Sequence, residues 1–416
     1  MINQGGTARE RLCMDIFHGG VFLFSNQEVK MNFSKAMKAA VIIFTGAIAA
    51  AGLTACGGIK TEADSPSKSG VKIGFIAALT GGAAAYGKSQ EEGIRMAVEE
   101  INQKGAIPIE LFVEDSKGSP SDAMNVTKRL IQKKAAVIIG PMTSNEAKAA
   151  GPIMQNAKIP SLEISVTAEG ITEIGDYIFR NSVPESMNIP QTAKKTHRLL
   201  GYETAAILYA HDNEQHVTAQ KYFRKTLEEE GVKIVDVETF GSKDSEYSAQ
   251  LTNIENAKPD VVIVCSYYQE GARILKKMRE MGMNQPVLGD NGFVSPELGK
   301  MAGAAADNVY VSSMWSAARD TAATKMFVEN YTKKYGHAPD QFAAAAYDGV
   351  YMAMDAVQRA GSVTDTRKIR DAMAEMKGFN GVCGTFSFDA KRDPVVDLVL
   401  LKMEDGVFLA AGKQSS

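Results

Sequence analysis

The 416-residue chain has few of the residues that build metal centres and no strong charge of one sign. Its four cysteines form no CxxC pair and its five histidines lack ligand spacing, so neither a metal nor another cofactor is expected. The formal net charge is only −3, without a large block of one sign. These features argue against a basic face for nucleic acid and against an acidic disordered tail.

The sequence also lacks the short motifs of several enzyme classes. The glycine-rich segment 81–87 does not follow the GxGxxG spacing of dinucleotide sites, and no GxxxxGK[ST] motif for nucleotide phosphates occurs. No GxSxG motif or carboxylate pair at motif spacing is present, although a hydrolase built on Ser144 and His216 stays a remote alternative. We therefore expect a binding protein and not an enzyme.

An apolar run at residues 39–53 is too short for a comfortable membrane span, which needs ~20 apolar residues. Lys35 and Lys38 precede the run and small residues end it, which is the order of a secretory signal. The ending Leu-Thr-Ala-Cys resembles the bacterial lipoprotein cleavage box and predicts a lipidated Cys56. The alternative is a cut nearby, with Cys56 incidental. We expect residues 1–56 to be a signal peptide with its lipobox, with Met31 as an alternative start, and 57–70 to be a flexible tether.

From residue 71 onward, short apolar runs alternate with amphipathic stretches in two successive series. The first series predicts strands at 71–76, 107–113, 136–140 and 159–164, and helices at 89–102, 119–134 and 145–156, the first with a Ser89–Glu92 capping box. The second predicts strands at 205–209, 232–240, 261–265, 286–289 and 309–312, and helices at 190–200, 217–230, 247–256, 270–281 and 296–301. Helices follow from 324 to 376, and antiparallel strands are expected at 385–388, 395–402 and 407–410.

This alternation predicts an α/β fold with two doubly wound parallel-sheet lobes. Cys265 and Cys383 fall within the fold, far apart in sequence, and we expect two buried thiols instead of a disulfide.

Ligands of open parallel sheets bind beyond the carboxyl ends of the strands, so the residues after each strand are candidates. Thr143 and Ser144 begin a helix whose free N–H groups would attract a carboxylate, and Asp290 could accept from an ammonium group. For Thr143 and Ser144 the structural alternative is a helix cap, and for Thr167 it is a turn.

Several segments resemble the periplasmic binding proteins for branched-chain amino acids. They are 71–92 with Leu79-Thr80-Gly81 and Tyr86-Gly87, 137–144, 159–172, 177–180, 289–298, Tyr347-Asp348 and 384–389. The resemblance implies two lobes joined by a three-segment hinge, at 71–187 plus 315–383 and at 188–314 plus 384–416. It implies a small amino-acid-like ligand delivered to an ABC permease and ATPase. It also implies an exported monomer, held by Cys56 at the periplasmic face or cell surface.

Carried over position by position, the resemblance implies that Ser144 and Thr167 hold the ligand carboxylate, and that Ser165 and Thr167 meet the ammonium. Tyr86, Met142 and Tyr267 would border the side-chain pocket. Two positions depart from the family. Asn291 stands where leucine-binding members have an acidic residue, with Asp290 beside it, and His216 stands where the family has tyrosine. His216 faces the ligand or is a solvated loop residue. Three alternatives stay open: a sensor for an amide, urea or aromatic acid, the remote hydrolase, and a structural lipoprotein without a ligand.

Overall fold

The computed structural model describes residues 70–105 and 107–411. The predicted signal peptide, the lipobox with Cys56 and most of the predicted tether lie outside the described residues.

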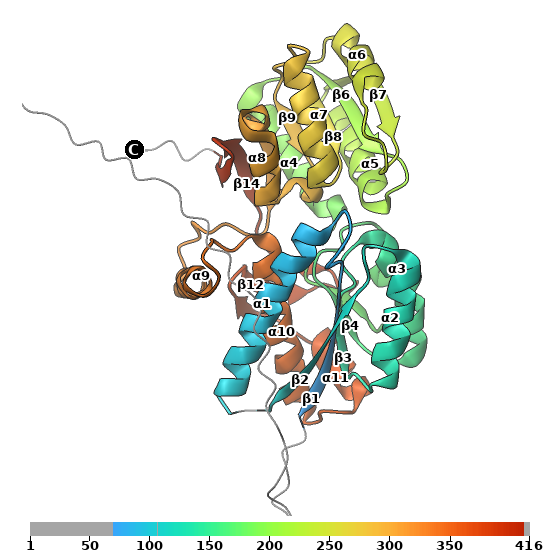
Figure 1. The fold of residues 1–416 in the computed structure, drawn as a ribbon, viewed down its shortest axis with the longest axis vertical. Helices are drawn as coiled ribbons and strands as arrows, with labels where there is room; N and C mark the ends of the chain where they lie inside the picture. The colour runs from blue at the N-terminus through green and yellow to red at the C-terminus, as the bar shows by residue number, and fades with distance from the viewer. Residues whose placement is uncertain (1–69, 106, 412–416) are drawn as a thin grey trace, which may run out of the picture. The chain divides into compact units, whose positions relative to one another are not determined.

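The first sheet consists of parallel strands in the order β2-β1-β3-β4-β5, with helices on both faces (Figure 1). Its strands are β1 (Val71–Ala77), β2 (Ile109–Asp115), β3 (Val137–Ile139), β4 (Ser161–Glu163) and β5 (Ile178–Arg180). Side chains alternate between the two faces of a strand. In β1, therefore, Ile73 and Phe75 join one core cluster while Ile76 joins the other.

The helices that cover the first sheet come from two distant parts of the chain. They are α1 (Ala84–Gln103), α2 (Pro120–Gln132), α3 (Ser144–Ala157), α10 (Gln341–Ala360) and α11 (Thr366–Ala374), with the short 3-10 turn η1 (Thr172–Ile174). Helix α9 (Ala322–Tyr335) packs against α1 and α10 in a separate cluster. Val350 and Val357 of α10 pack in the same core as Ile94 of α1, whereas Leu130 of α2 and Met154 of α3 fill the opposite face.

The second sheet has the order β15-β14-β10-β9-β8-β6-β7, parallel except for β14 and β15. Its strands are β6 (Thr204–Ala210), β7 (Lys233–Phe240), β8 (Val261–Cys265), β9 (Val287–Gly289), β10 (Val309–Ser313), β14 (Val399–Glu404) and β15 (Val407–Ala410). Ile207 packs on the face covered by α4 (Glu185–Leu200) and α5 (Glu214–Glu229), and Leu208 packs on the other. That other face is covered by α6 (Ser248–Ala257), α7 (Tyr268–Glu280) and α8 (Pro296–Ala302), with the 3-10 turns η2 (Asn291–Phe293) and η3 (Gly303–Ala306) nearby.

The chain passes between the two sheets three times, from β5 to α4, from β10 to α9 and from β13 to β14. The third passage differs from the predicted boundary at 383/384. Strands β11 (Phe379–Gly381), β12 (Gly384–Phe388) and β13 (Pro394–Val395) form a small antiparallel sheet. Phe388 of this sheet packs against Phe179 of β5, with ring centroids 5.4 Å apart. Residues 384–395 therefore pack with the first sheet, because their aromatic side chains complete its core.

Three local predictions were wrong. Helix α1 begins at Ala84, so Ser89 lies within the helix and makes no capping box; its hydroxyl donates to Asp340 instead. Strand β5 was not predicted, because three residues are too few to show a period. Helix α4 begins at Glu185, five residues before the predicted start at Pro190. Cys265 and Cys383 are free and buried, as predicted.

Candidate ligand-binding site

The loop after β3 leads directly into α3 and carries three of the predicted site residues. Thr143 is the N-cap of α3 and forms a capping box with Glu146, which confirms the structural alternative for this residue. Ser144 is fully buried, and its Oγ accepts a hydrogen bond of 3.2 Å from the backbone N–H of Ala168. Met142 is also buried, and its carbonyl accepts a 2.6 Å hydrogen bond from Ser165 Oγ. The start of α3 is therefore tied to the loop after β4.

The loop after β4 carries Ser165 and Thr167, and it accepts hydrogen bonds from both α1 and α4. Gln90 Nε2 donates to Ser165 Oγ at 2.8 Å. Thr167 Oγ1 donates to Glu185 Oε1 at 2.9 Å, and the Thr167 carbonyl accepts from the N–H of Glu185 at 2.9 Å. Thr167 is thus hydrogen-bonded to the first residue of α4. Helix α4 packs on the second sheet, so this contact joins the two halves of the protein.

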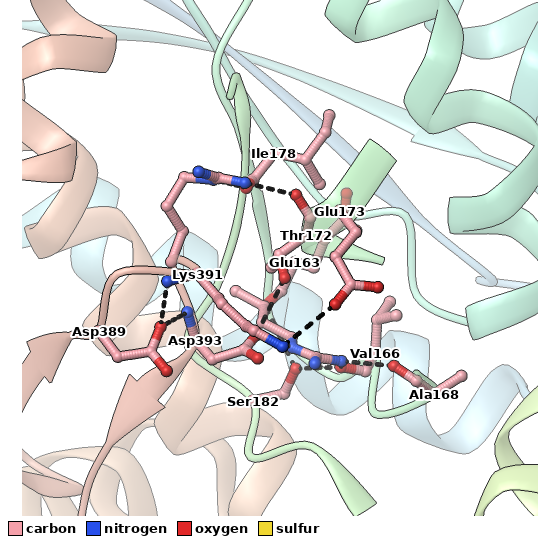
Figure 2. Close-up of polar contacts among 12 residues, drawn as sticks. Glu163, Val166, Ala168, Thr172, Glu173, Ile178, Ser182, Asp389, Lys391 and Asp393 are labelled. Atoms are coloured by element: carbon pink, nitrogen blue, oxygen red, sulfur yellow. Dashed lines mark hydrogen bonds and ion pairs between the residues drawn. The ribbon is translucent and has the colours of Figure 1, made fainter. Parts of the chain in front are cut away.

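A buried arginine fixes the backbone of this loop (Figure 2). Arg180 Nη1 donates to the carbonyls of Ala168 at 2.7 Å and Val166 at 3.4 Å. Its Nε lies 2.5 Å from Asp393 Oδ1, which comes from the turn between β12 and β13. The Arg180 side chain is only 3% exposed, so its charge depends on this one carboxylate. The small third sheet therefore supports the loop that carries Thr167.

Aromatic rings from both sheets meet around Tyr86 in the first turn of α1. Tyr86 Oη donates to the carbonyl of Gly292 at 2.5 Å and accepts from the N–H of Tyr268 at 2.9 Å. The rings of Tyr267, Tyr268 and Phe342 lie 5.7, 5.0 and 4.5 Å from the Tyr86 ring. Burial raises the pKa of the Tyr86 hydroxyl well above its usual value, so the hydroxyl stays a neutral bridge.

His216 and Asp290 form a buried pair in the second sheet's half of the site. His216 Nδ1 lies 2.6 Å from Asp290 Oδ2, and the imidazole lies 4.7 Å from the Tyr267 ring. His216 is 1% exposed and lies in the first turn of α5, so its interpretation as a solvated loop residue was wrong. The predicted helix start at 217 placed it outside the helix. Asn291 Oδ1 accepts from Gln341 Nε2 at 2.7 Å.

Glu185 also belongs to this buried network, although its local sequence did not predict this. It is fully buried, and its Oε1 accepts from Thr167 Oγ1 and, at 3.4 Å, from the backbone N–H of Asn291. Burial, and then the nearby charge of Asp290, raise the pKa of Glu185 well above its usual value. An acidic residue after a proline commonly begins a helix, so the sequence does not separate Glu185 from an ordinary exposed helix start. Only the tertiary fold shows that its carboxyl group is buried.

The structure therefore brings the predicted residues together at the carboxyl ends of strands from both sheets. Nine of them are buried and Tyr267 is partly buried; they are Tyr86, Met142, Thr143, Ser144, Ser165, Thr167, His216, Tyr267, Asp290 and Asn291. Hydrogen bonds from Tyr86 to Gly292 and from Gln341 to Asn291 connect the site residues of the first sheet's half with those of the second sheet's half. Their roles in ligand binding stay predictions.

Residues 70–105 and 107–411 contain no group of three or more His, Cys, Asp or Glu side chains that could hold a metal ion. In the same part of the chain, every helix is too short or too polar to cross a membrane.

Comparisons with known proteins agree with this architecture. A sequence profile described as periplasmic binding protein matches residues 70–407. The leucine-, isoleucine-, valine-, threonine-, and alanine-binding protein of Pseudomonas aeruginosa is 24% identical over 328 residues, which cover 78% of this chain and 87% of that protein.

Two solved structures share the fold. The branched-chain amino acid transporter substrate binding protein of Streptococcus pneumoniae, in complex with isoleucine, superposes with a TM-score of 0.78 at 31% identity, covering 82% of this chain and 98% of that one. An ABC transporter solute binding protein of Rhodopseudomonas palustris, in complex with 3,4-dihydroxy benzoic acid, has a TM-score of 0.75 at 27% identity, covering 82% and 96%.

These findings confirm the predicted α/β fold of two lobes and the predicted family. The profile covers most of the chain and extends over both sheets, from the start of β1 to the start of β15. The chain belongs to the periplasmic binding protein family.

Proposed function

We propose that this protein captures a small apolar amino acid, such as a branched-chain one, between its two lobes and delivers it to an ABC importer. One observation carries the proposal: hydroxyls, helix N–H groups and carboxylates from both sheets converge in one buried network around Thr167 and Glu185. Such a set complements both charges of a zwitterion, and the aromatic rings around Tyr86 complement an apolar side chain. Binding and lobe closure require no covalent chemistry.

A thermal-shift panel of amino acids tests this function. A ligand that binds only the folded state stabilises it by about 2.7 kcal/mol at a hundredfold excess over Kd. We expect leucine, isoleucine or valine to raise the melting temperature by several degrees. Acidic and basic amino acids should have little effect, because a charged side chain would lose its hydration among the buried aromatic rings. A panel in which no amino acid stabilises the protein would contradict the proposal.

An aromatic acid is the second candidate ligand, because the Rhodopseudomonas palustris relative holds 3,4-dihydroxy benzoic acid and three aromatic rings surround Tyr86 here. Including benzoate and 3,4-dihydroxybenzoate in the panel separates the two. Stabilisation by these acids alone would favour this second candidate.

We also propose that the mature protein is a monomer anchored to the membrane through lipidated Cys56. The predicted signal and the lipobox ending support this. Labelled palmitate should enter the wild-type protein during expression, and Cys56→Ser should abolish the labelling. Labelling that persists in Cys56→Ser would contradict the anchor.

A further inference from the structure

Glu185, the first residue of α4, is fully buried. Its carboxylate contacts Thr167 Oγ1, the N–H of Asn291 and, at 3.4 Å, Asn188 Nδ2. Among the described residues, no Lys, Arg or His pairs with it within 4.0 Å. A buried carboxylate without a cation is costly, unless a charge that is absent from the protein itself compensates it.

Two further buried oxygen atoms in this part of the site have no hydrogen-bond partner within the described ranges. They are Asn188 Oδ1 and Ser312 Oγ, on side chains that are 2% and 0% exposed. Asn188 lies three residues after Glu185, on the same face of α4. Turning the Asn188 amide around would place its oxygen against the Glu185 carboxylate, so the orientation with Oδ1 free is the favourable one.

Asn188 and Ser312 border a small cavity between the two sheets, and Glu185, which does not line it, adjoins it through its contact with Asn188. Asn188, Asn291, Ser312 and Gln341 line it, and its volume of about 10 Å³ is of the order that one water-sized group needs. An ammonium group is of that size and donates up to three hydrogen bonds.

Asp290, the acceptor predicted from the sequence, is already engaged. Its Oδ2 lies 2.6 Å from His216 Nδ1, and its Oδ1 accepts from the N–H of Gly292 at 3.0 Å. Both partners belong to the same half of the site as Asp290. Asp290 therefore has polar partners for both of its oxygens within its own half of the site, whereas no Lys, Arg or His among the described residues pairs with Glu185 within 4.0 Å.

We propose that Glu185, together with Asn188 Oδ1 and Ser312 Oγ, receives the ammonium group of the ligand, and that Glu185 sets the preference for amino acids over carboxylic acids without an amine. This assignment rests on the proposed function and names its specificity residue. Asp290 acts indirectly, by holding His216 in place against the Tyr267 ring.

Proton release on ligand binding is a second property that this assignment predicts. Burial and Asp290 both raise the pKa of Glu185, which favours the protonated form of this carboxyl group in the free protein. An ammonium ion stabilises the ionised carboxylate, so an amino acid should release that proton on binding. The same carbon skeleton without the amine should not.

The test is calorimetry of the purified protein with matched ligand pairs: leucine against 4-methylpentanoate, and valine against 3-methylbutanoate. We expect the wild-type protein to prefer the amino acid of each pair. Glu185→Gln keeps the shape but removes the charge. It should lower the affinity for the amino acid by about 30-fold and leave that for the carboxylic acid within about threefold. Asp290→Asn is the matched comparison; it should weaken both ligands of a pair while keeping their ratio.

A preference that survives in Glu185→Gln, or that Asp290→Asn abolishes to the same extent, would overturn the assignment while leaving the proposed function intact. A wild-type protein that binds aromatic acids and no amino acid would overturn both. Should Glu185→Gln fail to fold, as judged by its melting curve, proton release by the wild-type protein decides. Leucine binding in phosphate and in Tris buffer should give different heats, and equal heats would contradict the proposal.

Discussion

Glu163 should make this protein less stable as the pH rises, and replacing it should remove that dependence. Glu163 ends β4 and is fully buried; its Oε1 accepts from Ser161 Oγ at 3.1 Å. Its Oε2 has no partner within the described residues. Burial raises the pKa of Glu163 from 4.5 to about 8; Glu146 adds to the rise, whereas Ser161 and Arg180 oppose it.

The sign of the effect follows from proton linkage. Below pH 4.5 the group is protonated in both states, so its contribution to stability is fully present. Between 4.5 and 8 the unfolded chain loses the proton while the folded protein keeps it, so the free energy of unfolding falls as the pH rises. At about 1.4 kcal/mol per pH unit, this interval corresponds to a loss of about 5 kcal/mol, complete above pH 8.

Urea unfolding of wild type and Glu163→Gln at pH 5, 6.5 and 8 measures this effect. The variant should gain stability over the wild type progressively, with a difference of several kcal/mol at pH 8 and almost none at pH 5. Glu110→Gln, at an exposed position of β2 in the same sheet, is the control and should show no such trend. A difference between Glu163→Gln and wild type that stays constant with pH would refute the reasoning.

Three further predictions concern contacts around the site. Tyr86→Phe should weaken amino-acid binding by about tenfold in calorimetry, because it removes two hydrogen bonds between the two halves; unchanged affinity would mean that closure does not use them. Glu169→Gln breaks an exposed ion pair with Lys221 Nζ at 2.7 Å, so the affinity for the amino acid should change less than about threefold in calorimetry; a larger change would mean that this ion pair stabilises the ligand-bound form. Asp393→Asn leaves Arg180 buried without its carboxylate and should cost about 3 kcal/mol in urea unfolding, and a smaller cost than 1 kcal/mol would contradict this.

The sequence predicted much of the fold because its strands and helices are strongly periodic. Strand β8 (Val261–Cys265) has the predicted bounds, and α2 and α7 start within two residues of theirs. The capping box was placed at the wrong helix, because Ser89 and Glu92 have the same spacing as Thr143 and Glu146. Only the tertiary fold, in which Ser89 faces Asp340, separates the two cases.

Residues of the candidate site were predictable where they lie in the short segment after a strand, as Thr143, Ser165 and Tyr267 do. Contacts between distant segments were not predictable. Glu185 and Asn291 are 106 positions apart and Arg180 and Asp393 are 213 apart, and neither pair has a local signature. The same holds for Phe388, whose alternating strand is compatible with either sheet until Phe179 is seen beside it.

A crystal structure with the tightest-binding amino acid of the panel would test the central claim most directly. The account predicts the ligand carboxylate at the start of α3, against Ser144 and Thr167, and the ammonium within hydrogen-bond distance of Glu185. A ligand bound elsewhere on the protein, or one whose amine contacts Asp290 and avoids Glu185, would contradict it.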